Sequence, residues 1–131
     1  MAVDLLDIDR EVPYFEEPLN HEAGYCLDKA AETYGDEQAE VLLMRAYFLE
    51  PEHPMVLVGL YRYFYYQHRL EDALLVAERI LRVFAMRLEL PEDWRDLDDA
   101  RLGNGVLISM VLVRFYMLAL KGAGYLQLRL G

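Results

Sequence analysis

The sequence predicts an all-α fold of about six helices stacked as antiparallel pairs, and two observations lead to it. First, Ala39 and Ala73 are 34 positions apart, and each follows a short polar turn and opens a helical stretch. Second, the segment between them holds a helix stop and a helix start, at Pro51 and Pro54. A period near 34 residues with a small residue on the second helix is typical of stacked helix pairs. Such arrays display a surface, so the pattern favours binding over catalysis.

Composition and charge limit the class of protein. The chain has 131 residues, of which 55% are hydrophobic, and its formal net charge is −10. This length suits one core, and the apolar fraction argues against a disordered chain. The acidity argues against binding to nucleic acid, which needs clustered bases. Residues 1–52 hold 14 acids and 3 bases, whereas residues 100–131 hold four bases and no acid.

Two segments bear on localisation. Met1-Ala2-Val3-Asp4 begins acidic, where an export signal begins basic. The apolar run from Val106 to Leu120 is interrupted by Ser109 and Arg114, and it is shorter than the roughly 20 residues that span a membrane. We therefore expect a buried helix here, no membrane association and a cytoplasmic protein. The single cysteine, Cys26, excludes an intrachain disulfide and fits a reducing compartment.

Local signals mark the first helices. Residues 1–19 form an acidic N-terminal segment that its two prolines keep from being one regular helix. Asn20 is a good N-cap for a first helix that ends at Gly35. Asp36 caps a second helix, and Pro54 opens a third, which is apolar nearly all round.

The second half of the chain is expected to be less regular. A fourth helix runs from about residue 70 to residue 88, and a short helix opens at Pro91–Trp94. Gly103-Asn104-Gly105 breaks the chain. A long last helix then runs from about Asn104 towards Leu130.

From Leu57 to Leu81 the chain resembles the tetratricopeptide repeat (TPR) family, as a small bacterial protein of that type. Leu57, Leu60 and Phe64 match large packing positions of the family's first helix, and Ala73 matches the small position of its second. His68 replaces the glycine that is usual at the turn. The resemblance implies a right-handed superhelical domain over residues 20–131. It divides that domain into a weak repeat (20–53), the clearest repeat (54–87), an irregular insertion with a short helix (88–103) and a long terminal helix or half repeat (104–131).

The resemblance also implies a binding groove lined by the first helix of each pair. Its predicted residues are Met55, Val58, Arg62, Tyr65 and Tyr66 in the clearest repeat, with Lys121, Tyr125 and Arg129 in the terminal half repeat. Tyrosine and arginine are enriched at interface hot spots. The alternatives are a core helix whose tyrosine hydroxyls find partners at its edge, and a solvated face for the last three residues. Some members of the family are co-chaperones that clamp the terminal carboxylate of a peptide with lysines and asparagines. Gly24 and Asp28 stand where a basic residue and an asparagine would be needed, which argues against this kind of co-chaperone.

Patterns for catalysis are lacking. The three histidines are scattered without metal-ligand spacing, and Cys26 has no nearby base, so it is interpreted as a core residue. No phosphate-binding glycine loop is present, and the acids of residues 93–99 lack the calcium-loop pattern. We therefore expect no enzyme, no cofactor and no metal.

The expected function is a non-catalytic adaptor that binds a protein or peptide partner in a TPR-like groove. Two alternatives stay open: a small acidic holding chaperone of the secretion-chaperone type, and an accessory factor in metalloenzyme assembly, as in nitrogen-fixation gene clusters. The apolar end from Gly124 to Leu130 is a poor cap for a helical array. Three alternatives stay open: the last helix is a solvating cap, the chain is a trimmed part of a longer repeat protein, or the C-terminal helix packs against a second copy in a homodimer.

Overall fold

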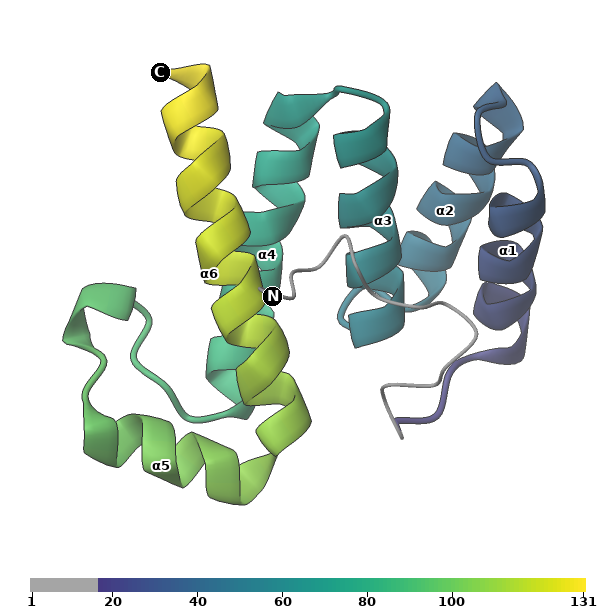
Figure 1. Ribbon diagram of the computed structural model, residues 1–131. Coiled ribbons are helices and arrows are strands. Elements are labelled where there is room, and N and C mark those ends of the chain that lie inside the picture. Colours follow the sequence, from purple (N-terminus) through teal and green to yellow (C-terminus); the bar gives the residue numbers. More distant parts are fainter. Residues whose placement is uncertain (1–16) are drawn as a thin grey trace. The chain divides into compact units, whose positions relative to one another are not determined.

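The computed structural model describes residues 17–131, and their regular structure is helical (Figure 1). Within that range there are six α-helices, one short 3₁₀ helix and no strand. The predicted all-α class with about six helices is therefore confirmed. Most of the acidic segment predicted for residues 1–19 lies outside the described residues. The described chain divides into two compact units, residues 17–76 and residues 77–131, and each is described by itself.

The unit of residues 17–76 holds three helices and the start of a fourth. They are α1 (His21–Glu32), α2 (Glu37–Leu49), α3 (Pro54–Tyr66) and the first turns of α4 (Leu70–Arg87). Figure 1 shows α1, α2 and α3 side by side, joined by short turns. The predicted caps are confirmed, because Asn20 accepts a hydrogen bond from the Ala23 N–H at 3.0 Å and Asp36 accepts one from Gln38. Gly35 provides the turn between α1 and α2 with φ of 98°.

His53 caps α3, a role that the sequence analysis did not assign. The backbone N–H of Met55 donates to its Nδ1 at 3.1 Å, and its Nε2 lies 3.1 Å from the carbonyl oxygen of Glu17. A carbonyl can only accept, so the neutral tautomer with hydrogen on Nε2 satisfies both contacts. The buried ring thus anchors the residues before α1 to the first turn of α3.

Small side chains allow the helices of this unit to pack closely. Ala23 of α1, and Ala39 and Ala46 of α2, are fully buried. On α3, a Cβ added to Gly59 would meet the side chains of Leu27 and Leu43 within 3.9 Å. Cys26 is buried in the same unit, as its interpretation as a core residue predicted. Backbones that approach this closely leave the larger side chains of α3 to fill the remaining space.

The turn between α3 and α4 uses a left-handed residue that is not glycine. His68 has φ of 60°. The N–H of Arg69 donates to the carbonyl of Phe64 at 2.9 Å, and the N–H of His68 donates to that of Tyr65 at 3.0 Å. This pair of bonds is the Schellman motif, whose left-handed position glycine occupies at least cost.

Replacing His68 by glycine should stabilise the fold. We expect His68→Gly to raise the free energy of unfolding by about 0.5–1 kcal/mol, because a side chain in the left-handed region costs energy that glycine avoids. Urea unfolding followed by circular dichroism measures the change. Gln67→Gly is the matched control, since Gln67 has an ordinary φ of −84° and glycine there should be destabilising. Equal effects of the two substitutions would contradict this account.

The unit of residues 77–131 comprises the rest of α4, the 3₁₀ helix η2 (Trp94–Asp96), α5 (Asp99–Ile108) and α6 (Met110–Leu130). In Figure 1, α5 lies crosswise to α6. The largest fully buried side chains of this unit are those of Ile80, Phe84, Leu88, Tyr116 and Leu126. Burial raises the pKa of the Tyr116 phenol, and the nearby Asp93 carboxylate raises it further.

The predicted break at Gly103-Asn104-Gly105 is wrong. Those residues lie inside α5, and the chain bends at Ser109 instead. The Ser109 hydroxyl accepts a hydrogen bond from the Leu112 N–H at 3.1 Å, so serine is the N-cap of α6. Two glycines weaken a helix without ending it, whereas a capping serine within an apolar run creates a new start.

The prediction of one buried helix from Val106 to Leu120 is also wrong in its first part. Leu107 is 85% exposed and Met110 is 69% exposed, while Phe115, Tyr116 and Ala119 are buried. The apolar corner between α5 and α6 therefore faces outward. None of the helices in residues 17–131 combines the length and apolar character that crossing a membrane requires.

The two glycines of α5 should respond in opposite ways to alanine. A Cβ at Gly103 meets nothing within 4 Å, so Gly103→Ala should raise the free energy of unfolding by about 0.5–1 kcal/mol. A Cβ at Gly105 would lie 3.2 Å from Val113 Cγ2 and 3.4 Å from Leu90 Cδ2. Because the β-branched valine is stiff, Gly105→Ala should lose this gain and destabilise the unit. Thermal unfolding of both variants checks the order, and a more stable Gly105→Ala would refute the close approach.

Candidate functional site

The aromatic residues at the end of α3 divide between a buried side and a half-open side. Tyr63 and Phe64 are buried, and the Tyr63 ring meets the Tyr34 ring edge-on with centroids 5.5 Å apart. On the other side, the Tyr65 centroid lies 6.1 Å from that of Tyr61 and 6.1 Å from that of Tyr66. These edge-on and tilted contacts are the arrangements that aromatic rings prefer. They hold Tyr65 and Tyr66 in place at the helix end.

The structure places the predicted residues of this helix at different depths. Met55, Arg62 and Tyr65 are half-buried, and Tyr66 is 49% exposed. These four side chains therefore have surface to offer to a partner. Val58 is only 5% exposed, so its side chain belongs to the core and offers almost no contact area.

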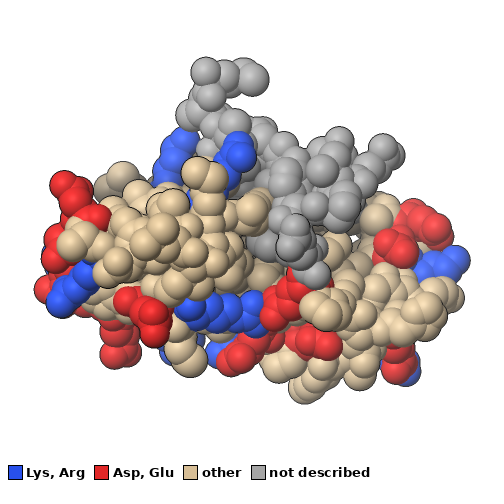
Figure 2. Space-filling view, turned by 90° about the horizontal axis from the view of Figure 1, so that it is seen from below, with Lys and Arg blue, Asp and Glu red and all other residues tan. Residues whose placement is uncertain are grey.

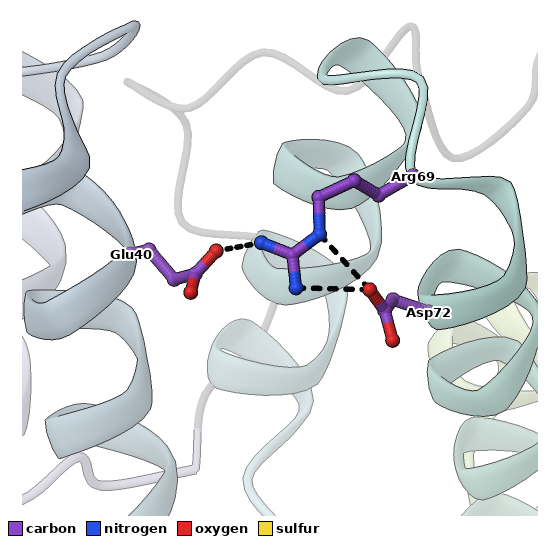
Figure 3. Close-up of polar contacts among 3 residues, drawn as sticks. All are labelled: Glu40, Arg69 and Asp72. Atoms are coloured by element: carbon purple, nitrogen blue, oxygen red, sulfur yellow. Dashed lines mark hydrogen bonds and ion pairs between the residues drawn. The ribbon is translucent and has the colours of Figure 1, made fainter.

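Arg69 joins three elements beside this aromatic end (Figure 3). Its guanidinium pairs with the Glu40 carboxylate of α2, and its Nε and Nη2 both lie 2.9 Å from Oδ2 of Asp72 in α4. Its Cζ also lies 4.7 Å from the centroid of the Phe64 ring in α3. One side chain thus makes two ion pairs and a cation–π contact. The cluster Glu40–Arg69–Asp72, named here the Arg69 cluster, ties α2, the α3 end and the α4 start together.

Removing Arg69 should cost more than removing an isolated surface arginine. We expect Arg69→Ala to lower the free energy of unfolding by about 1–2 kcal/mol, because it loses the ring contact and both carboxylate partners. Arg45→Ala is the control, since Arg45 pairs only with Glu22 in the described contacts and its side chain is 64% exposed. It should change stability by less than about 0.5 kcal/mol.

The comparison is made by urea unfolding at low and at high salt. High salt should shrink the ion-pair part of the Arg69 effect and leave the ring contact. Equal costs for the two arginines would show that the Arg69 cluster adds nothing beyond ordinary surface pairs.

The second predicted group lies on α6, in the other compact unit. Lys121, Tyr125 and Arg129 are exposed along one face of that helix. Arg129 Nη1 donates a hydrogen bond to the Tyr125 hydroxyl at 2.8 Å, and its Cζ lies 5.8 Å from the Tyr125 ring centroid. The predicted four-residue spacing thus produces a real contact between Tyr125 and Arg129. The group on α3 and the group on α6 belong to different compact units.

Sequence reasoning missed Arg69 and the exposed apolar residues at the start of α6. Arg69 directly follows the turn, and only the folded chain brings it to Glu40, 29 positions earlier. Residues 17–131 contain no group of three or more His, Cys, Asp or Glu side chains placed to hold a metal ion. The described residues offer two kinds of contact to a partner. On α3 these are the rigid rings of Tyr65 and Tyr66 with the half-buried side chain of Arg62 beside them, and on α6 they are the exposed bases Lys121 and Arg129.

Comparison with known proteins shows a clear sequence similarity. No family model matches the chain, and no solved structure gives a significant match. The chain is 46% identical over 129 residues to the "uncharacterized 19.8 kDa protein in nifW 5′ region" of Azotobacter chroococcum mcd 1. The alignment covers 98% of this chain and 72% of the Azotobacter protein.

Proposed function

This chain belongs to the same family as the Azotobacter chroococcum protein, and we propose that it is a non-catalytic adaptor that binds a partner protein through the end of α3. The partner would meet Tyr66, Tyr65 and Arg62, with Met55 at the other end of the same helix. We further propose that the helices form TPR-like pairs, α1 with α2 and α3 with the first turns of α4. The order of the helices, the short turns and the buried alanines support that arrangement.

The observation that carries the proposal is the half-open aromatic end of α3. Tyr66 keeps 49% of its surface exposed although its ring is fixed against Tyr65. Rigid tyrosines provide a large contact area with little loss of side-chain entropy on binding. The adjacent Arg62 supplies donors for a carboxylate or a carbonyl of the partner.

Capture from lysate tests this proposal. Immobilised wild-type chain should retain a partner that Arg62→Ala/Tyr65→Ala loses by at least about tenfold, since two hot-spot side chains are removed. The matched control is Phe48→Ala on α2, because Phe48 is 80% exposed and lies outside the proposed site. Circular dichroism of each variant separates lost binding from lost folding.

Three results decide between the possibilities. Retention by wild type and Phe48→Ala but not by the double variant supports the site on α3. Retention by all three proteins places the partner elsewhere. Loss with Phe48→Ala alone moves the site to α2 and rejects the α3 surface.

A second candidate function follows from the relative's printed description. That protein is described as lying in the nifW 5′ region, so we extend a link with nitrogen fixation to this chain as a proposal. In this form the adaptor is an accessory factor whose partner is a metalloenzyme or one of its assembly proteins. Capture from cells grown with and without fixed nitrogen tests it. A metalloenzyme partner retained only from nitrogen-fixing cells supports this candidate, whereas an aggregation-prone, metal-free partner favours a holding chaperone.

A further inference from the structure

One face of α6 alternates apolar and basic side chains along its length. Met110, Arg114, Met117, Lys121, Tyr125 and Leu128 are spaced four, three, four, four and three residues apart. This spacing keeps all six side chains on one side of a helix. They extend over about 27 Å at the rise of an α-helix. We call these six residues the α6 stripe.

The α6 stripe is the outward side of a helix whose other side is well packed. Phe115, Tyr116, Ala119, Ala123 and Leu126 are buried on the opposite face. The apolar members of the α6 stripe are exposed, Met117 and Tyr125 by 43% and 44% and Met110 and Leu128 by 69% and 84%. Leu107 and Ile108, at the end of α5 just before this helix, are exposed as well. Exposed apolar side chains gathered on one helix face are typical of a binding surface.

Charge indicates what would cover this face. The α6 stripe carries Arg114 and Lys121 between its apolar residues, and residues 100–131 contain no acid. A second α6 placed against it would bring bases close to bases, which disfavours a symmetric pairing. On the face of the molecule shown in Figure 2, uncharged side chains cover wide areas between the charged ones.

We propose that the α6 stripe binds an acidic amphipathic helix of a partner protein. Apolar residues of that helix pack between Met110, Met117 and Leu128, and its carboxylates pair with Arg114 and Lys121. The 4,3 spacing is the one with which two helices interlock side by side. The inference rests on the proposed adaptor function and adds a second surface, with a defined partner chemistry, to the site on α3.

The test uses two synthetic 21-residue helical peptides with leucine on one face. One carries glutamate beside the leucines, and the other carries lysine at the same positions. Fluorescence anisotropy measures binding of each peptide to the full chain. We expect the acidic peptide to bind, and Arg114→Glu/Lys121→Glu to weaken it by at least about tenfold while improving binding of the basic peptide. Leu128→Ser should also weaken the acidic peptide, because it removes apolar contact without changing charge.

The control is Arg45→Glu/Arg82→Glu, which makes the same change in net charge on exposed residues of α2 and α4. This variant should bind the acidic peptide within about twofold of wild type, because its bases lie outside the α6 stripe. Circular dichroism confirms that each variant is folded. Equal loss in both double variants would overturn the proposal, since binding would then follow net charge.

Two further outcomes would also overturn it. A dimer in analytical ultracentrifugation that Leu128→Ser dissociates would make a second copy the occupant. Stronger binding to phosphatidylserine vesicles than to the acidic peptide would make it a lipid surface. The peptide assay does not involve Tyr65 or Tyr66. A negative result for the α6 stripe therefore does not affect the proposed site on α3, which the lysate capture tests independently.

Discussion

The close approach of α1, α2 and α3 is the constraint on which the rest of the first unit depends. Fully buried alanines on α1 and α2, and Gly59 on α3, bring the helices near enough for short turns to connect them. A larger residue at one of the buried alanine positions would push backbones apart in a core that packs like a solid. With the backbones fixed in this way, Tyr63 and Phe64 fill the space inside. The neighbouring Tyr65 and Tyr66 are then directed to the edge.

The Arg69 cluster completes this arrangement at the end where the proposed site lies. Phe64 packs against the guanidinium of Arg69, and Glu40 and Asp72 hold that guanidinium from two helices. The aromatic end of α3 is therefore supported by packing on one side and by charge on the other. Such support keeps a binding surface in one conformation before the partner arrives, which lowers the entropic cost of binding.

Local signals in the sequence predicted the first unit well. Asn20, Asp36 and Pro54 mark helix starts through effects that act within one turn, and the structure has helices at each of them.

The second unit was predicted less well because its boundaries depend on packing. Gly105 stays in a helix since its missing side chain admits Val113 and Leu90, a contact that no local pattern reveals. A serine within an apolar run can mark a helix start, because its hydroxyl can cap the helix. The sequence analysis interpreted Ser109 only as an interruption of that run. Of the residues predicted for a groove on α3, Met55, Arg62, Tyr65 and Tyr66 keep exposed surface, whereas the burial of Val58 was decided by its neighbours.

The most direct measurement is photocrosslinking inside the cell. A photoreactive phenylalanine analogue placed at Tyr66 reports any protein within contact distance of the aromatic end of α3. The same analogue at Phe48, which is 80% exposed on α2, reports nonspecific encounters. If the end of α3 binds a partner, illumination should give a discrete adduct from position 66 and none from position 48. An adduct from position 48 alone, or identical adducts from both positions, would contradict the assignment of the partner site to α3.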